Sequence, residues 1–474
     1  KTFRNKILSQ KTFCAVKYKK KFFAQEVLLY EKERKKRMKE ERTVVDFIMV
    51  MNHFFHYLRE WLLEMDDPRN KSYITYTQAD LFYMGLLKNV CGQYSMRGMD
   101  ENFNEENCID TLRILSGNKK LNEMPHYDTL NYYLERLSPE CVSALRKKMV
   151  TSLIRGKQFN KGRLQKKYWR IILDGTGLFY FKEKHCENCL CVERTDKDGK
   201  KRKQYYHKVL EAKITLSENV IISIGTEFIE NENEEVSKQD CELNAAKRLL
   251  ERIKKEYPRL PICIQGDALY ATEPFMKLCK EYKWSYLLTQ KSGRQKNVDE
   301  GFEWIKKGED TEYQTGLCEE KGRGFYANHV EEVAGKEEIM NVFEYEYEGK
   351  DKKQKTTFRW ITNLEINKRN LEELIQAGRW RWKIENEGFN NQKNGLYRIE
   401  HLNSRNSNAM KNHYLITQIA DILMQLYLAW NPYVKELKQT IKNTSSKLLE
   451  SFRRLKVTEE DVSYILRYTT IYLE

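Results

Sequence analysis

Apolar residues recur at helical spacing through the first third of the chain. In the segment 44–63 they return every three or four positions, which predicts an amphipathic helix. Pro125 and Asp128 stand before the run 129–137, in positions typical of a helix start. The first 160 residues are therefore predicted to be all-helical, with further helices at 77–91, 107–117, 127–137 and 139–155.

Near Tyr168 the pattern changes to short, continuous apolar runs. The run 168–181 is rich in β-branched and aromatic residues, which is typical of a buried strand. Further strands are predicted at 209–216, 220–229, 260–265 and 284–290, and helices at 237–257 and 273–282. Strands interleaved with helices indicate an α/β core.

Two more changes of pattern divide the rest of the chain. Residues 295–365 alternate between polar and apolar and are rich in turn residues, which predicts a β-rich insertion with a hairpin turn at 349–351. Helical spacing returns at 368–393 and at 408–430, where one apolar face is expected to pack on the core. The predicted organisation begins with a helical region at 1–160. A core follows in two parts, at 161–294 and 366–432, with the β-rich insertion between them at 295–365. A helical tail is predicted at 433–474.

Charge and cysteine content narrow the class of protein. The 474 residues include 84 Lys and Arg against 69 Asp and Glu, a formal net charge of +15, and the segment 31–42 reads as a highly charged helix. No apolar run is long enough for a membrane helix. The excess of positive charge therefore indicates a polyanionic binding partner, most often a nucleic acid; an increase in solubility alone is the alternative. The 11 scattered cysteines fit reduced thiols in a cytosol better than a disulfide framework.

Two aspartates occupy unusual places in the predicted strands. Asp174 follows three apolar residues inside the first strand, and Asp267 ends the fourth. A carboxylate in a buried strand is costly unless it is hydrogen-bonded, paired or bound to a metal. If these two strands are neighbours, the carboxylates would repel one another unless a cation lies between them. Mg²⁺ prefers such oxygen ligands, and two ions can clamp an in-line phosphoryl displacement.

A third carboxylate is expected from the helix at 368–393. Glu385 shares a helix face with Arg381, Phe389 and Gln392, whereas Glu387 lies roughly 200° away around the helix and is expected on its outer side. A guanidinium one turn before a metal-binding carboxylate suits a phosphodiester substrate.

The segments around these three acids resemble the carboxylate motifs of DDE transposases of bacterial insertion sequences. They are ILDGTGLFYF at 172–181, GDALYA at 266–271 and RWKIENEGF at 381–389, and the resemblance covers about residues 165–430. It implies a ribonuclease-H-like mixed sheet flanked by helices, with a β-strand insertion between the second and third acids. It further implies that Asp174, Asp267 and Glu385 bind two Mg²⁺ or Mn²⁺ ions and catalyse DNA cleavage and strand transfer.

The third motif departs from the family in two places. Members often have a tyrosine three residues before the arginine and a lysine seven after the glutamate, where this chain has Gly378 and Gln392. Lys393, one step later, or Lys411 is expected to make the phosphate contact instead. Other expected DNA contacts are Arg381 and the loop residues Lys291, Arg294 and Lys296, together with the aromatic residues Tyr270, Trp380 and Trp382, for which core packing is the alternative.

A cluster of cysteines and histidines lies between the first and second strands. The turn signal Asp198–Gly199 predicts a hairpin whose register pairs Leu190 with His207. His207 with Cys186, Cys189 and either His185 or Cys191 would form a tetrahedral Zn²⁺ site. A reduced, metal-free hairpin is the alternative.

These features together predict a DNA transposase. The expected partners are the double-stranded ends of its element and target DNA, bound partly by the helical N-terminal region. The resemblance further implies that the protein forms a homodimer in a synaptic complex with DNA. It also implies that the protein acts at the nucleoid in the bacterial cytoplasm and is not bound to a membrane. A DNA-binding protein that has lost catalysis and a nuclease of the same fold without strand transfer are the alternatives. No motif of serine hydrolases, zinc proteases or P-loop ATPases occurs.

Overall fold

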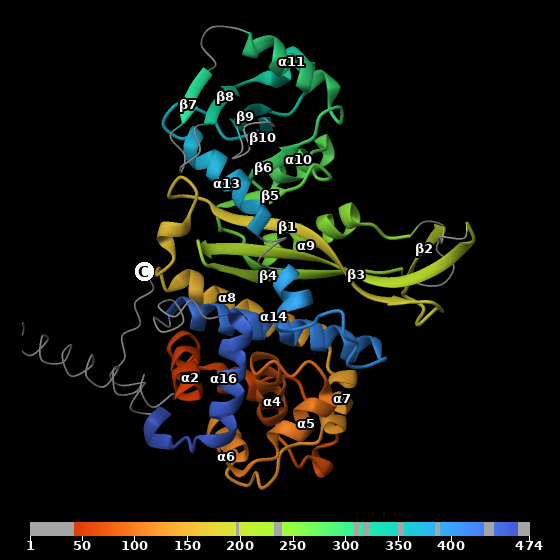
Figure 1. Cartoon of the computed structure of the whole chain (residues 1–474), viewed down its shortest axis with the longest axis vertical. Coiled ribbons are helices and arrows are strands. Elements are labelled where there is room, and N and C mark those ends of the chain that lie inside the picture. The colour runs from red at the N-terminus through yellow and green to blue at the C-terminus, as the bar shows by residue number, and fades with distance from the viewer. Residues whose placement is uncertain are drawn as a thin grey trace, which may run out of the picture.

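The computed structural model is a mixed α/β structure in which one long sheet stands above a group of helices (Figure 1). It describes residues 42–195, 199–231, 239–307, 312–315, 322–348, 355–383, 389–430 and 440–462. Glu385, nearly all of the charged segment 31–42 and the turn at 349–351 lie outside these ranges. No helix within them has both the length and the apolar character needed to cross a membrane.

The described residues of the N-terminal part, from Arg42 onward, are helical, as predicted. Local signals start several of its helices: Thr77 and Asp80 form a reciprocal capping box, and Ser138 caps a helix whose first residue is Pro139. The helices are α2 (Thr43–Phe54), α3 (Leu58–Leu63), α4 (Gln78–Val90), α5 (Met96–Phe103), α6 (Glu106–Ser116), α7 (Tyr127–Arg136) and α8 (Pro139–Arg155).

The C-terminal helix returns to the N-terminal helices. Helix α16 (Ile441–Arg454) packs against α2 and α6, where Phe452 meets Phe103 edge to face and Ser451 accepts a hydrogen bond from the backbone of Val44. The predicted tail is therefore part of the helical region in space (Figure 1).

The sheet contains the predicted core strands in mixed orientation. The strands are β1 (Trp169–Phe181), β2 (Leu190–Thr195), β3 (Lys201–Ser217), β4 (Val220–Ile229), β5 (Ile262–Gly266), β6 (Ser285–Gln290), β7 (Glu312–Thr315), β8 (Gly322–Ala327), β9 (Asn341–Glu348) and β10 (Lys355–Thr362). Their order is β2-β3-β1-β5-β6-β10-β9-β8-β7, and β4 also pairs with β3. β1, β5 and β6 run parallel, and the other pairs are antiparallel. The predicted mixed sheet flanked by helices is confirmed.

The predicted insertion continues this sheet. Strand β10 pairs with β6, so the inserted strands lengthen the core sheet at its free edge. The segment also contains two helices, α11 (Lys296–Lys306) and α12 (Val330–Ala334), that the alternating pattern did not predict. Val298 and Phe302, one helical turn apart, are buried and give α11 its packed side.

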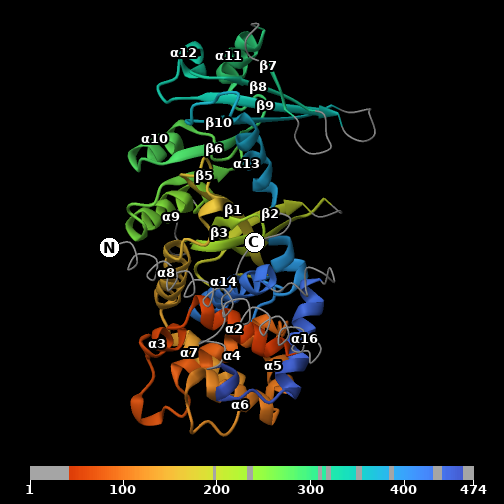
Figure 2. The ribbon, with the colours of Figure 1, turned by 90° about the vertical axis from the view of Figure 1, so that its left-hand side faces the viewer.

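Four helices complete the core: α9 (Glu242–Glu256), α10 (Glu273–Glu281), α13 (Leu371–Lys383) and α14 (Ser407–Trp430). α14 lies between the sheet and the N-terminal helices, contacting β4 on one side and α4 and α7 on the other (Figure 2). The apolar face predicted for it is buried, but so is most of its remaining surface, because helices cover the second side. There the amide of Asn412 donates to the carbonyls of Leu134 and Leu137.

Candidate functional site

Asp174 and Asp267 lie level with one another on neighbouring parallel strands. The β1–β5 pairing runs from Trp169 opposite Ile262 to Ile172 opposite Gln265, and each aspartate comes two residues after that last pair. The predicted adjacency of the two strands is thus confirmed. Both side chains belong to half-buried residues.

Backbone amides orient one oxygen of each carboxylate. Asp174 Oδ1 accepts from the N–H of Gly175 at 3.0 Å, and Asp267 Oδ1 accepts from the N–H of Leu269 at 2.8 Å. Such bonds hold the carboxylates in place. Asp174 thus lies just beyond the parallel pairing of β1 with β5, and Asp267 directly follows β5. Ligands commonly bind at the carboxyl ends of parallel strands in α/β sheets.

The chain on both sides of Glu385 is anchored near this pair. Helix α13 is tied to β5 by Gln265, whose Nε2 donates to the carbonyl of Ala377 at 2.8 Å. Phe389 is buried and packs against Ile172. Because Ile172 and Asp174 are two residues apart in one strand, they point to the same face of the sheet. The segment that contains Glu385 is therefore bounded by residues that contact the strands bearing both aspartates.

The two departures from the family motif have physical causes. A Cβ on Gly378 would lie 2.6 Å from the indole of Trp360, so the close packing of α13 on β10 excludes a tyrosine there. Gln392 is buried, and its Nε2 donates to Gln418 at 3.2 Å and to Asp421 at 3.0 Å. It is therefore a packing residue that joins this segment to α14.

A fourth carboxylate, missed from the sequence, lies against Gly175, on the sheet face opposite to the side chain of Asp174. Glu242 is the first residue of α9, and its carboxylate accepts from Tyr270 Oη at 2.7 Å and from Lys208 Nζ at 2.5 Å. A Cβ on Gly175 would lie 2.3 Å from Glu242 Oε2, so a larger residue after Asp174 would require the ends of the Glu242 and Lys208 side chains to move. That glycine within an apolar strand was the one signal in the sequence.

The hydroxyl of Tyr270 connects this carboxylate to the aspartate pair. Burial raises the pKa of Tyr270 well above its usual value, and the charges of Glu242, Asp174 and Asp267 raise it further. The chain of contacts from Tyr270 through Glu242 to Lys208 fastens the turn after Asp267 to β3. This bracing ties the turn after Asp267 to β3, which pairs with the strand that carries Asp174.

A second missed residue is Lys213 on β3. It pairs with Ile172, its side chain is fully buried, and its Nζ lies 4.9 Å from the ring centre of Phe389. Within the described part of the chain its ammonium has no hydrogen-bond partner. It places a positive charge on the same sheet face as Asp174, where it offsets part of the negative charge.

The loop after β6 has the exposure expected of a DNA contact. Lys291, Arg294 and Lys296 are exposed, and Arg294 Nη2 donates to the carbonyl of Leu269 at 3.4 Å. This bond places the loop beside the turn that follows Asp267. Arg381 is half-buried on α13, and Trp382 next to it is 58% exposed.

Four other residues expected to contact DNA make contacts within the protein. Tyr270 is only 1% exposed, so neither face of its ring is open to a base. Lys411 is paired with Glu230 at 2.6 Å, and Lys393 with Glu400 at 2.9 Å. Trp380 is half-buried with the Arg170 guanidinium 4.5 Å from its ring centre, which agrees with the alternative of packing.

The cysteines and histidines between β1 and β3 converge on one point. Cys186 Sγ lies 3.5 Å from Cys189 Sγ and 3.3 Å from His207 Nε2, and Cys189 Sγ lies 3.4 Å from that nitrogen. With a nitrogen of His185, the four atoms lie within 4.8 Å of one another. The predicted hairpin register was one residue off: Leu190 pairs with Tyr206, because residues 196–200 connect the strands in place of a two-residue turn.

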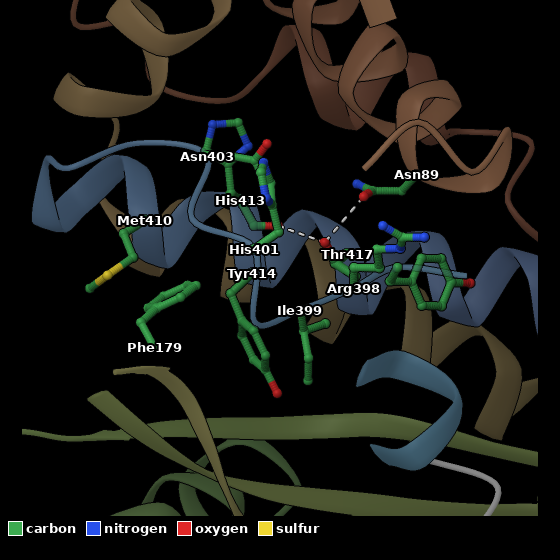
Figure 3. A pocket seen from close by; sticks show the side chains of 11 residues that line it. Asn89, Phe179, Arg398, Ile399, His401, Asn403, Met410, His413, Tyr414 and Thr417 are labelled. Carbon is green, nitrogen blue, oxygen red and sulfur yellow. Dashed lines mark hydrogen bonds between the residues drawn. The ribbon is translucent and has the colours of Figure 1, made fainter. Parts of the chain in front are cut away.

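A small pocket lies elsewhere, between α14, the segment 397–403 and the end of β1 (Figure 3). Burial lowers the pKa of His413 to about 3 and that of nearby Lys88 to about 7. The pocket is lined by Asn89, Phe179, Tyr397, Arg398, Ile399, His401, Asn403, Met410, His413, Tyr414 and Thr417, and it contains no acidic side chain. It is therefore separate from the aspartate pair.

Comparison with known proteins identifies the family. The model of the family described as "Transposase DDE domain" matches residues 165–420, more than half of the chain. A similar solved structure is the cryo-EM structure of the piggyBac transposase synaptic complex with hairpin DNA, at 12% identity and a TM-score of 0.39 over 90% of this chain and 85% of that chain; a likeness this distant carries no argument about function. No curated protein matches significantly. Because the family match spans both aspartates and the position of Glu385, the resemblance is confirmed, and this chain belongs to the transposase DDE domain family.

Proposed function

We propose that this transposase binds double-stranded DNA at the ends of its element, cuts it and joins the ends to target DNA. The observation that carries the proposal is the level placement of Asp174 and Asp267 on neighbouring parallel strands. The family match supports it, because it covers the strands and helices that hold these residues.

Asp174, Asp267 and Glu385 would hold two Mg²⁺ or Mn²⁺ ions. The donor set fits such ions, because the carboxylates of Asp174 and Asp267 each come two residues after the last pair of neighbouring parallel strands. Negative charges gathered in a half-buried place are costly unless cations neutralise them. When bound, the ions activate the attacking hydroxyl and neutralise the leaving oxygen of the phosphodiester.

The protein's own groups position the acids and the DNA. The N–H groups of Gly175 and Leu269 orient the two aspartates, and the Tyr270–Glu242–Lys208 contacts keep their strands together. Lys291, Arg294 and Lys296, exposed beside the turn after Asp267, supply positive charge for the phosphates of the bound strand. Arg381, on the helix before Glu385, is proposed to contact the phosphate next to the cut.

Two further parts of the proposal concern assembly. The helical region at 1–160 would recognise the element ends, and its basic first 50 residues, with 15 Lys and Arg against 6 Asp and Glu, suit the DNA backbone. Two copies of the chain would hold two ends together as a homodimer, working at the nucleoid in the bacterial cytoplasm.

Cleavage of defined DNA ends tests the proposed function. The purified chain is incubated with Mg²⁺, a duplex carrying the element's candidate terminal repeat and a supercoiled target plasmid; a scrambled repeat and a chelator serve as controls. We expect cutting at the repeat and joining to the plasmid, both abolished by the chelator. Binding without cutting in Mg²⁺ or Mn²⁺ would favour a non-catalytic DNA-binding protein, and cutting without joining would favour a nuclease.

Removing the hydrogen bond between Tyr270 and Glu242 should slow DNA cleavage without abolishing it. Tyr270→Phe removes the hydroxyl that bonds Glu242 while keeping the buried ring. We expect the cleavage rate to fall about 10-fold to 100-fold, as is typical when a group that supports metal ligands is lost, and the free energy of unfolding to fall by about 1 kcal/mol. Single-turnover cleavage and urea denaturation measure the two effects. Tyr282→Phe on the far end of α10 is the matched control and should leave cleavage unchanged; an unchanged rate in Tyr270→Phe would remove the bracing role.

A further inference from the structure

We propose that His185, Cys186, Cys189 and His207 form a structural Zn²⁺ site that fastens the base of the β2–β3 ribbon to the sheet. The set is complete with two sulfurs and two nitrogens, so it fills a tetrahedral shell and leaves no open position for a substrate. The site lies apart from the carboxylates and does not depend on the proposed function.

The spacing of three of the four ligand atoms is close to that of a zinc tetrahedron. Zn–S and Zn–N bonds of about 2.3 and 2.05 Å at tetrahedral angles separate two sulfurs by about 3.8 Å and a sulfur from a nitrogen by about 3.6 Å. The corresponding distances here are 3.5 Å between the sulfurs of Cys186 and Cys189, and 3.3 and 3.4 Å from these sulfurs to His207 Nε2. Both cysteines are free thiols, so no disulfide accounts for their approach.

The two imidazoles lack other partners. Both ring nitrogens of His185 and Nδ1 of His207 are shielded from solvent, and none has a hydrogen-bond partner in the described part of the chain. Buried polar atoms without partners are costly, and an ion would satisfy one nitrogen of each ring. Glu230 Oε1 lies 3.9 Å from His207 Nδ1, the side on which a carboxylate commonly supports a ligating histidine.

The geometry settles which residue completes the set. Cys191 lies in β2 opposite Tyr205, and its backbone N–H and carbonyl both bond the side chain of Gln239. Its sulfur is not among the converging atoms, whereas a nitrogen of His185 is. The fourth ligand is therefore His185.

The ion would secure a junction in the sheet. β2 and β4 both pair with β3, and the Cys186–Cys189 loop lies where they meet, with Asn231 Nδ2 donating to the Cys189 carbonyl at 3.0 Å. Beyond this point the ribbon of β2 and the first part of β3 projects from the body of the protein (Figure 1). Its exposed side chains include Arg194, Lys201 and Lys203. Fixing its base would fix the direction in which these charges point.

Metal content tests the site without any measurement of activity. The full chain is purified without added zinc or chelator, and its zinc is measured by mass spectrometry. We expect about one Zn²⁺ per chain in the wild type and in Cys191→Ser, and less than about 0.1 in the Cys186→Ser/Cys189→Ser double variant. His185→Cys should retain the ion, because a Cys₃His set is also tetrahedral, and His185→Ala should bind it much more weakly.

Two results would overturn the site. One is a folded wild-type chain that contains no zinc and takes up none from an equimolar solution. The other is His185→Ala keeping its zinc while Cys191→Ser loses it. Hydrogen exchange adds a structural readout: removing the ion should speed exchange in β2 and in the first half of β3 and leave β5 and β6 unchanged. Because DNA cleavage enters none of these measurements, failure here leaves the proposed function standing.

Discussion

Asp174→Asn should bind the element's DNA ends and fail to cut them. The change keeps the shape of the side chain but removes the charge that would hold a metal ion beside Asp267. We expect the cleavage rate to fall by about 1000-fold or more, which corresponds to losing about 4 kcal/mol of transition-state stabilisation. A gel-shift assay should give an unchanged affinity for the DNA, since the neighbouring loop of Lys291 and Lys296 is untouched. Asp267→Asn should behave in the same way.

A matched acid-to-amide change controls for altered charge. Glu332 is exposed on α12, in the inserted segment, and Glu332→Gln should cleave at the wild-type rate. Thermal unfolding of both variants should match the wild type, because Asp174 is half-buried and its backbone contacts remain. Equal cleavage by Asp174→Asn and the wild type would remove Asp174 from the mechanism.

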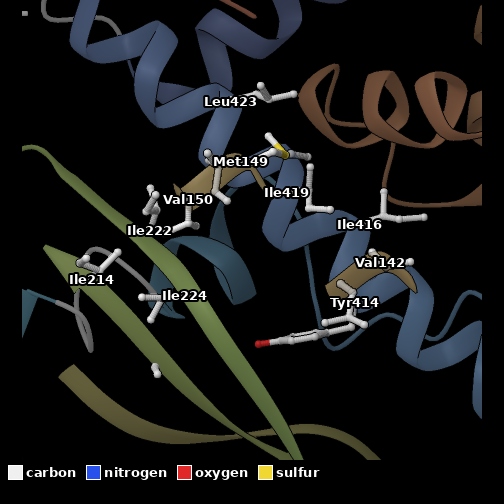
Figure 4. Packing of buried hydrophobic residues seen from close by; sticks show 14 of the residues in the cluster. Val142, Met149, Val150, Ile214, Ile222, Ile224, Tyr414, Ile416, Ile419 and Leu423 are labelled. Carbon is white, nitrogen blue, oxygen red and sulfur yellow. The ribbon is translucent and has the colours of Figure 1, made fainter. Parts of the chain in front are cut away.

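Arg146→Met should destabilise the whole chain. Arg146 is buried on α8, and its guanidinium donates to Ser223 at 2.9 Å and to Thr226 at 2.5 Å on β4; both hydroxyls donate to the buried carboxylate of Glu211. The surrounding packing is apolar, including Val142, Met149, Val150, Ile222 and Ile224 (Figure 4). Methionine would fill the space but leave the charge of Glu211 unpaired inside the protein. We expect the free energy of unfolding to fall by about 3–5 kcal/mol, measured by urea denaturation.

A second substitution separates charge from packing. Burial raises the pKa of Glu211 and Arg146 opposes that shift, so Glu211→Gln removes the charge that Arg146 balances while keeping one acceptor oxygen and the size of the side chain. Arg146→Met/Glu211→Gln should therefore be more stable than Arg146→Met alone, with a coupling of at least about 1 kcal/mol. A double variant no more stable than the single one would show that the attraction between the charges of Arg146 and Glu211 is not what α8 contributes to the sheet.

The order of the core strands along the chain, and the positions of the two aspartates relative to them, could be predicted from the sequence for a physical reason. β1 and β5 are buried on both sides, so their apolar runs are continuous, and a charged residue within or at the end of such a run stands out. The burial of Lys213 and Glu211 could not be predicted from the sequence. The two residues alternate with apolar residues in β3, and this pattern is also typical of side chains that face solvent. Their burial depends on α8 and α14, which come from distant parts of the chain.

Other features depended on contacts that no local pattern records. Glu242 looks like any acid at a helix start, and only its approach to Gly175 and Tyr270 joins it to the site. The hairpin register failed by one residue because the turn signal Asp198–Gly199 fits a two-residue loop, whereas Thr195 pairs with Lys201. The Cys186–Cys189 spacing nevertheless indicated a metal site, since ligands close in sequence converge whatever the exact register.

Metal-specific rescue of Asp174→Cys is the most direct test of the claim that Asp174 holds a metal ion for DNA cleavage. A thiolate at this position is a poor ligand for Mg²⁺ and a better one for the softer Mn²⁺. We predict no cleavage by Asp174→Cys in Mg²⁺ and partial recovery in Mn²⁺, while Asp174→Ala stays inactive in both. Either of two results would contradict the account. One is cleavage by Asp174→Cys at the wild-type rate in Mg²⁺. The other is that both the cysteine and the alanine variants are inactive in Mn²⁺ under conditions in which the wild type cleaves DNA.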